Sequence, residues 1–192
     1  ENHMGNILQS LSKTVHASVI LAILLFLGMH FFGEGFAFDR IFWSWLSRYV
    51  HVIVATMWIG LLWYFNFVQI PNMSKISDEQ KPAITKVIAP AALLYFRWAA
   101  AFTVVSGLIL AHLNGYAHEA LKLGIGSGYG KNTVVGIGMW LGIIMAYNVW
   151  FVIWPNQKKA LGMVDCQPEE KAKSARTAML FSRTNALLSL PM

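Results

Sequence analysis

Three histidines lie near the ends of three separate long apolar segments of this 192-residue chain, at His30, His51 and His112. If the segments cross a membrane in alternating directions, all three side chains come to the same end of the bundle. Imidazoles on facing helices can be the axial ligands of a b-type haem, and neutral imidazole also suits copper and zinc. The spacing therefore predicts a haem b site held by His51 and His112, with copper or zinc bound by His51, His112 and His30 as the alternative. A third interpretation is that these histidines only hydrogen-bond between helices.

The segment from Arg48 to Met73 carries its polar residues on one side. An α-helix turns by about 100° per residue. That rotation aligns five side chains along one narrow face, with Asn66 at its edge: His51, Ala55, Trp58, Leu62 and Gln69. Polar side chains in a membrane helix face a protein interior or a bound group rather than lipid. We therefore expect Trp58 to form a flat wall beside the haem, and Arg48, one turn before His51, to pair with a haem propionate.

A second polar cluster is expected deeper in the membrane. Arg97, Asn66, Gln69 and Asn148 come from three different apolar segments and fall at comparable depth. A charged arginine inside a membrane is costly and usually has a partner. Because none of the apolar segments contains Asp or Glu, the expected partner is an amide, a backbone carbonyl, water or an anionic ligand. The alternative is that Arg97 extends towards the interface or ties helices together through the asparagines.

The composition is that of a membrane protein. Hydrophobic residues make up 56% of the sequence and charged residues only 12%, so a soluble domain of this size would expose too much apolar surface. Apolar runs of about 20 residues are long enough to cross a bilayer. We therefore predict an all-α bundle that forms one integral membrane domain over residues 1–192. Its predicted spans cover residues 15–32, 46–70, 87–113, 133–154 and, as a fifth, 178 onward.

Prolines and glycines mark the expected ends and contacts of these spans. Pro71 and Pro155 are expected to end the second and fourth spans, because proline interrupts a helix. Gly138 and Gly142 form a small-xxx-small pattern, which allows another segment to approach closely.

The basic residues are arranged as topology signals. Ten of the fifteen Lys and Arg residues lie in the N-terminal segment and in the second and fourth connectors, and only four lie in the first and third. This bias predicts a multi-pass protein of a bacterial inner membrane with a cytoplasmic N-terminus. It also argues against nucleic acid as a partner, despite the pI near 9.6. Cys166 is the single cysteine, which excludes an internal disulfide and a covalent CxxCH haem site within this chain.

Four long motifs cover most of the chain from Arg48 onward: RYVHVIVATMWIGLLWYFNFVQ, IAPAALLYFRWAAAFTVVSGLILAHLNG, GIGMWLGIIMAYNVWFVIWPNQKKALG and ARTAMLFSRTNALLSLPM. They resemble the membrane domain of the PuuD-type urate hydroxylases and their stand-alone relatives. The H-x(6)-W-x-G element from His51 to Gly60 is also similar, more distantly, to the opening of the HemJ-type haem-binding membrane proteins.

This resemblance implies a helix bundle that exchanges electrons, with His51 and His112 as haem or metal positions and Arg97 in an internal site. PuuD-type enzymes oxidise urate and pass electrons to a c-type cytochrome. Because this chain has no CxxCH motif, the implied acceptor is a separate cytochrome.

Three functions follow from these observations. The first is a haem b redox protein, a possible membrane oxidoreductase in electron transport. The second is a non-catalytic subunit packed against a larger respiratory or oxygenase-type complex. A small-molecule or metal transporter ranks last, because broken helices at mid-membrane mark transporters and only Pro90, near a span end, offers such a break.

Overall fold

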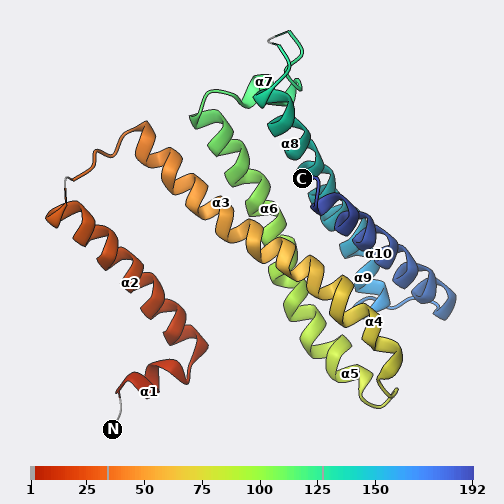
Figure 1. Ribbon diagram of the computed structural model, residues 1–192. Coiled ribbons are helices and arrows are strands. Elements are labelled where there is room, and N and C mark those ends of the chain that lie inside the picture. The colour runs from red at the N-terminus through yellow and green to blue at the C-terminus, as the bar shows by residue number, and fades with distance from the viewer. Residues whose placement is uncertain (1–2, 34, 127) are drawn as a thin grey trace. The chain divides into compact units, whose positions relative to one another are not determined.

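The computed structural model describes residues 3–33, 35–126 and 128–192, and every regular element in those ranges is helical. The elements run in this order: α1 (His3–Leu8), α2 (Leu11–Phe32), α3 (Arg40–Trp63), η1 (Tyr64–Gln69), α4 (Ile70–Asn72), η2 (Met73–Lys75), α5 (Lys81–Ala83), η3 (Ile84–Ile88), α6 (Ala89–Leu113), α7 (Ala117–Leu121), α8 (Lys131–Tyr147), η4 (Asn148–Ile153), α9 (Trp154–Ala160) and α10 (Pro168–Ser189). Figure 1 shows their path. The predicted all-α fold is confirmed.

Within the described residues, four continuous helical stretches are long and apolar enough to cross a membrane: Leu11–Phe32, Arg40–Lys75, Lys81–Leu113 and Lys131–Ala160. They correspond to the first four predicted spans, and each extends beyond the predicted bounds or matches them. The architecture is therefore that of a polytopic membrane protein.

The chain divides into two compact units, residues 1–42 and 43–192. In the first unit, α2 has no buried residue. Its C-terminal end meets the following loop through an aromatic cluster in which Phe26 and Phe36 have ring centroids 4.5 Å apart, and Phe36 stacks on Phe42 at 5.7 Å. This cluster folds the loop back onto the last turns of α2.

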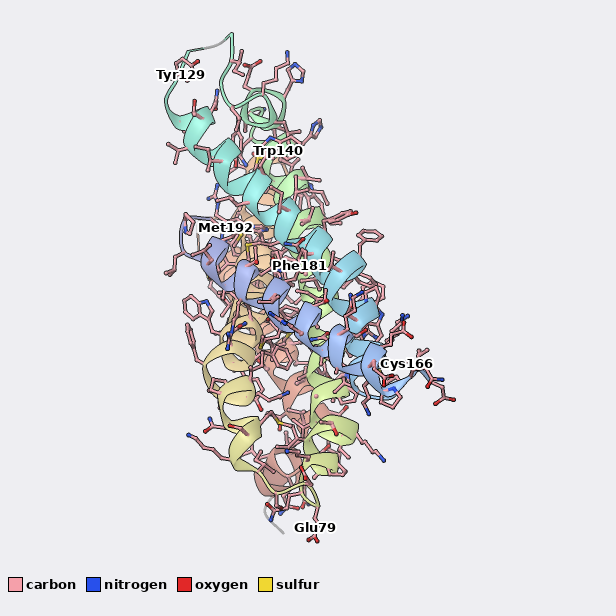
Figure 2. The ribbon with its side chains drawn as sticks, turned by 90° about the vertical axis from the view of Figure 1, so that its right-hand side faces the viewer. Glu79, Tyr129, Trp140, Cys166, Phe181 and Met192 are labelled. Carbon is pink, nitrogen blue, oxygen red and sulfur yellow. The ribbon has the colours of Figure 1, made fainter. Side chains whose placement is uncertain are left out.

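The second unit has its core where α3, α6, α8 and η4 meet. Its largest fully buried apolar side chains come from these elements: Trp58, Leu62, Phe96, Met145, Val149 and Ile153. Helix α10 runs back along η4 and α9, and Figures 1 and 2 show it lying against them. The core thus joins residues separated by more than eighty positions in the sequence.

The prolines do not end the helices as predicted. The second helical stretch continues through Pro71 to Lys75, and the fourth continues through Pro155 to Ala160. Before each proline, and before Pro90, the backbone widens into a π-helical turn. The N–H of the preceding residue then bonds to the carbonyl five residues back: Ile70 to Phe65, Ala89 to Ile84, and Trp154 to Val149.

The physical reason is the clash between a proline ring and the carbonyl four residues earlier. A π-helical turn relieves that clash and re-satisfies backbone groups inside a membrane helix. The prediction overlooked this adjustment.

Helix α10 covers the start of the predicted fifth span and begins earlier, at Pro168. It is not among the four helices that are apolar enough to cross a membrane. Instead it buries a stripe of small and polar side chains against the bundle: Ser174, Ala178, Ser182 and Asn185.

Candidate functional site

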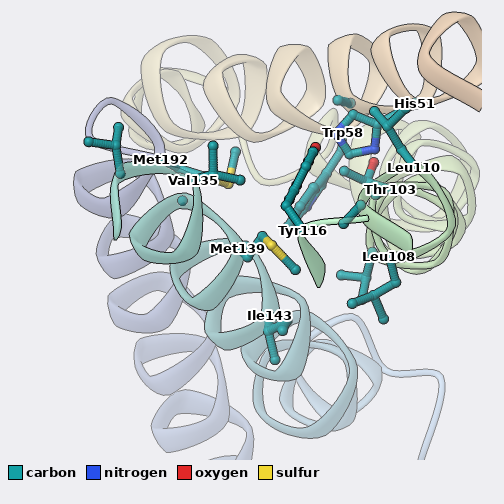
Figure 3. Close-up of a pocket in the computed structure, with 17 residues that line it drawn as sticks. His51, Trp58, Thr103, Leu108, Leu110, Tyr116, Val135, Met139, Ile143 and Met192 are labelled. Carbon is teal, nitrogen blue, oxygen red and sulfur yellow. The ribbon is translucent and has the colours of Figure 1, made fainter. Parts of the chain in front are cut away.

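A cavity of about 400 Å³ lies between α3, α6 and α8 in the second unit. Its walls are mostly apolar, and its side chains of chemical interest are His51, Trp58, Thr103, Tyr116, Met139 and Met192. Figure 3 shows these residues arranged around it. The volume falls in the range of about 300–1,000 Å³ that is usual for sites that bind small molecules and cofactors.

The predicted polar face of α3 supplies one wall. His51, Ala55 and Trp58 line the cavity, and Trp58 and Leu62 are completely buried. Successive residues of this face lie about one turn apart, so the imidazole and the indole come from neighbouring turns of one rigid helix. The prediction of this face from helical periodicity is confirmed over these four residues.

The close approach of α6 to His51 depends on Gly107. A Cβ atom at Gly107 would lie 2.9 Å from Cε1 of the imidazole. That is shorter than a normal contact between carbon atoms. Glycine at this position therefore lets the imidazole lie directly against the α6 backbone.

Helix α6 contacts this imidazole through a serine hydroxyl. His51 Nδ1 lies 3.1 Å from Ser106 Oγ. The Ser106 hydroxyl also lies within hydrogen-bond distance of two carbonyls of its own helix, Phe102 at 2.6 Å and Thr103 at 3.2 Å. If its single hydrogen is donated to either carbonyl, the hydroxyl accepts the Nδ1–H of His51, and the lone pair of the imidazole lies on Nε2. This is the tautomer in which a histidine binds a metal through Nε2, with its other nitrogen held by an outer partner.

The other two histidines of the predicted set lie elsewhere. His112 is exposed and does not line the cavity. The cavity face of α6 includes Thr103, Gly107 and Ala111, and His112 is about 100° further round the helix from Ala111. The predicted pair of His51 and His112 is therefore not brought together here.

His30 belongs to the first unit, residues 1–42. Its Nδ1 accepts the backbone N–H of Phe36 at 3.3 Å, and its ring packs 4.7 Å from that of Phe36. In this unit His30 holds the loop that follows α2. Arg48, the predicted propionate partner, is exposed on α3 one turn before His51 and does not line the cavity.

Two thioethers lie on the cavity wall opposite α3, from Met139 of α8 and from Met192. Met192 follows α10 and packs on Gly138 and Gly142, the small-xxx-small pair of α8. A Cβ at Gly138 would lie 2.8 Å from the carbonyl oxygen of Met192, and a Cβ at Gly142 would lie 3.4 Å from the sulfur of Met192. Imidazole with thioether is an axial ligand set of cytochromes. The cavity lining, with one imidazole and two thioethers, therefore includes ligand types that haem iron takes.

The predicted internal polar site separates into two parts, of which the first ties α10 to the bundle. Asn66 Nδ2 donates to Ser182 Oγ at 2.9 Å, and Asn148 Nδ2 donates to Asn185 Oδ1 at 2.9 Å. Asn185 also donates to the Met145 carbonyl at 2.9 Å and is fully buried. Asn66 and Asn148 thus bind neighbouring turns of α10.

The second part comprises Arg97 and Gln69. Within the described residues, these two side chains form no hydrogen bond with each other. The Arg97 guanidinium lies 3.9 Å from the Trp154 ring centroid. Gln69 lines a second cavity of about 240 Å³ between the α3–η1 helix, α6, α9 and α10. Arg97 Nη1 and Gln69 Oε1 are both buried without a hydrogen-bond partner in the described part of the chain.

Several residues of these sites were not predicted from the sequence: Ser106, Gly107, Tyr116, Met139, Ser182, Asn185 and Met192. A signal for some of them exists. On α6 the small residues at positions 99, 103, 106, 107 and 111 follow one helical face, and small residues mark the interior face of membrane helices. Tyr116 and Met192 lie outside the long helices, so helical periodicity says nothing about them.

Comparison with known proteins yields no further assignment, since no family model, no curated protein and no solved structure matches this chain. Within residues 3–33, 35–126 and 128–192, there is also no group of three or more His, Cys, Asp or Glu side chains placed to hold a metal ion. The copper or zinc alternative therefore stays a prediction.

Proposed function

We propose that the protein is a haem b-binding redox protein of a bacterial inner membrane, with His51 as the axial imidazole. The observation that carries the proposal is the 3.1 Å contact of His51 Nδ1 with Ser106 Oγ beside an apolar cavity. When the hydroxyl accepts the Nδ1–H, the Nε2 lone pair is available for iron. When bound, haem supplies reversible one-electron chemistry at its iron.

The residues of the cavity have separate roles in this proposal. Ser106 and Gly107 of α6 hold the imidazole in place, and Met139 offers a thioether from the opposite wall. Trp58 and Tyr116 exclude water with flat aromatic surfaces, and a low dielectric around haem is one of the ways in which a protein sets its potential. Arg48, outside the cavity, is the cation closest in sequence to His51.

The resemblance to PuuD-type urate hydroxylases supports a direction for the electrons. We propose that they pass to a separate c-type cytochrome, and that the N-terminus lies in the cytoplasm. The latter rests on the distribution of Lys and Arg among the connectors.

The test is the absorption spectrum of the detergent-purified protein, oxidised and then reduced with dithionite. We expect a Soret band and a sharp b-type α-band on reduction. His51→Ala should abolish both, because it removes the only imidazole among the cavity-lining residues. His112→Ala is the matched control, because it removes an exposed imidazole from the neighbouring helix, and it should leave the spectrum unchanged.

Two results would contradict this assignment. Loss of the bands in His112→Ala, with His51→Ala unaffected, would show that haem binds away from this cavity. A featureless spectrum of protein purified from cells supplied with a haem precursor would refute haem binding. The alternative function, a non-catalytic subunit of a larger membrane complex, would then be tested by identifying proteins that co-purify.

A further inference from the structure

The charge of Arg97 has no counter-ion in the described part of the chain. The ion pairs found there are Lys81 with Asp78 and Lys159 with Glu170, and neither involves Arg97. One guanidinium nitrogen, Nη1, is buried without a hydrogen-bond partner. The guanidinium lies over Trp154, 3.9 Å from the ring centroid. A cation–π contact attracts the positive charge but does not neutralise it.

A second cation reaches the same indole. Lys158, one turn after Trp154 on α9, places Nζ 5.7 Å from the Trp154 ring centroid. Lys158 also forms no ion pair with a described carboxylate. Two positive charges that share one aromatic ring repel each other, and the repulsion is strong where the dielectric constant is low. Arg97 as a whole is only half-buried, and an anion that bonds to both cations would offset this repulsion.

The surroundings indicate where such an anion comes from. Arg97 and Trp154 both lie on helices that are long and apolar enough to cross a membrane. Trp98 beside Arg97 is 48% exposed, and Phe151 on the turn before Trp154 is 68% exposed. Tryptophan is enriched where a membrane meets water. These exposed aromatic side chains offer an apolar surface for acyl chains beside the two cations, which a free ion in solution would not use.

The same end of the bundle is rich in lysine. Lys75 ends the second helical stretch, Lys81 and Lys86 lie in the first turns of the third, and Lys159 lies in the last turn of the fourth. Of these, Lys81 is paired with Asp78 and Lys159 with Glu170, whereas Lys75 and Lys86 form no ion pair with a described carboxylate. Figure 1 shows the α4–α5 connection at the lower tip of the second unit and α9 above it, in the same half. Clusters of basic side chains attract anionic lipids, and basic pockets between membrane helices bind their head groups.

We propose that Arg97, Trp154 and Lys158 form a binding site for the phosphate group of an anionic phospholipid. The phosphate oxygens would accept hydrogen bonds from the accessible part of the Arg97 guanidinium and from Lys158 Nζ, and the acyl chains would lie along the exposed aromatic side chains of α6 and η4. This site is separate from the haem cavity, since none of its three residues lines that cavity.

The test is native mass spectrometry of the detergent-purified full chain, titrated separately with phosphatidylglycerol, phosphatidylcholine and inorganic phosphate. We expect phosphatidylglycerol to be retained several-fold more than the zwitterionic phosphatidylcholine, and inorganic phosphate at the same concentration not to displace it. Arg97→Gln and Lys158→Gln should each lower retention of phosphatidylglycerol several-fold. Lys158 is half-buried on the short helix α9 and forms no ion pair with a described carboxylate, so its variant tests the site even if Arg97→Gln does not fold.

Lys131→Gln is the matched control. Lys131 Nζ also lies 5.7 Å from the centroid of an aromatic ring, that of Tyr116. Lys131 is the first residue of α8 and lies at the end of that helix that is far from Trp154. Lys131→Gln should leave retention of phosphatidylglycerol unchanged. Equal retention of the two lipids would overturn the proposal, and so would equal losses in Lys131→Gln and Lys158→Gln. Displacement of the lipid by inorganic phosphate would overturn its assignment to a lipid.

Discussion

The buried amide of Asn185 should be one of the main determinants of how firmly α10 is held. Its side chain is completely excluded from solvent. It accepts a hydrogen bond from Asn148 Nδ2 and donates one to the Met145 carbonyl, both at 2.9 Å. Asn185→Ala removes both bonds and leaves the amide of Asn148 without its partner on α10.

The magnitude follows from these contacts. A hydrogen bond contributes about 1 kcal/mol net, and a buried donor left without a partner costs about 1–3 kcal/mol. Side-chain hydrogen bonds between membrane helices average only about 0.6 kcal/mol, because the unfolded helices also find partners. We therefore expect Asn185→Ala to lower the free energy of unfolding by about 2–3 kcal/mol. In a double-mutant cycle, Asn148→Ala and Asn185→Ala should show a coupling energy of about 1 kcal/mol.

The assay is reversible unfolding in mixed micelles by increasing SDS, followed by circular dichroism. Thr184→Ala is the control, because Thr184 is exposed on the adjacent position of α10 and its hydroxyl bonds only to the Leu180 carbonyl of its own helix. It should change the free energy of unfolding by less than about 0.5 kcal/mol. If Asn185→Ala and Thr184→Ala are equally stable, the asparagine pair does not hold α10, and our reasoning about this helix is wrong.

Two further predictions concern close approaches at glycine. Gly107→Ala should push the His51 imidazole out of place, because the new Cβ would lie 2.9 Å from its Cε1. Titration with haem should show an affinity reduced at least several-fold. In the control Gly60→Ala, the new Cβ has no heavy atom within 4 Å, and the affinity for haem should be unchanged. Gly136→Ala places a Cβ 2.0 Å from the Ala120 carbonyl oxygen. This overpacking should lower the free energy of unfolding by about 1–3 kcal/mol in the same SDS assay. A variant as stable as the parent protein would show that α7 is not packed against α8.

The spans and one functional face could be predicted from the sequence because both depend on local pattern. An apolar run of sufficient length must be helical inside a bilayer, where every backbone group needs a partner. The α3 face with His51 and Trp58 follows from the regular rotation of an α-helix. The rotation is no longer regular once η1 begins at Tyr64. Gln69 lies 18 residues after His51, about 27 Å further along the helix, and therefore lines the second cavity.

The choice of His112 could not be made correctly from periodicity, for a physical reason. Helix α6 is apolar almost all round, so its hydrophobic pattern does not say which face meets α3. What decides the face is close packing, through Ser106 and Gly107 against His51. Small residues specify such contacts in membrane helices, where lipid is as apolar as the side chains. His112 lies at a suitable depth but on another face.

The prolines connect the fold to the asparagine contacts of α10 and to the site of Arg97 and Trp154. A π-helical turn precedes Pro71 and Pro155, and such turns in α-helices often occur at functional sites. Asn66 lies within the first of these turns and Asn148 opens the second, which directs both amides inward to α10. The turn in η4 also sets the rotation of the residues after it, including Trp154. The widened turn before Pro155 therefore determines both how α10 is bound and which indole face meets Arg97.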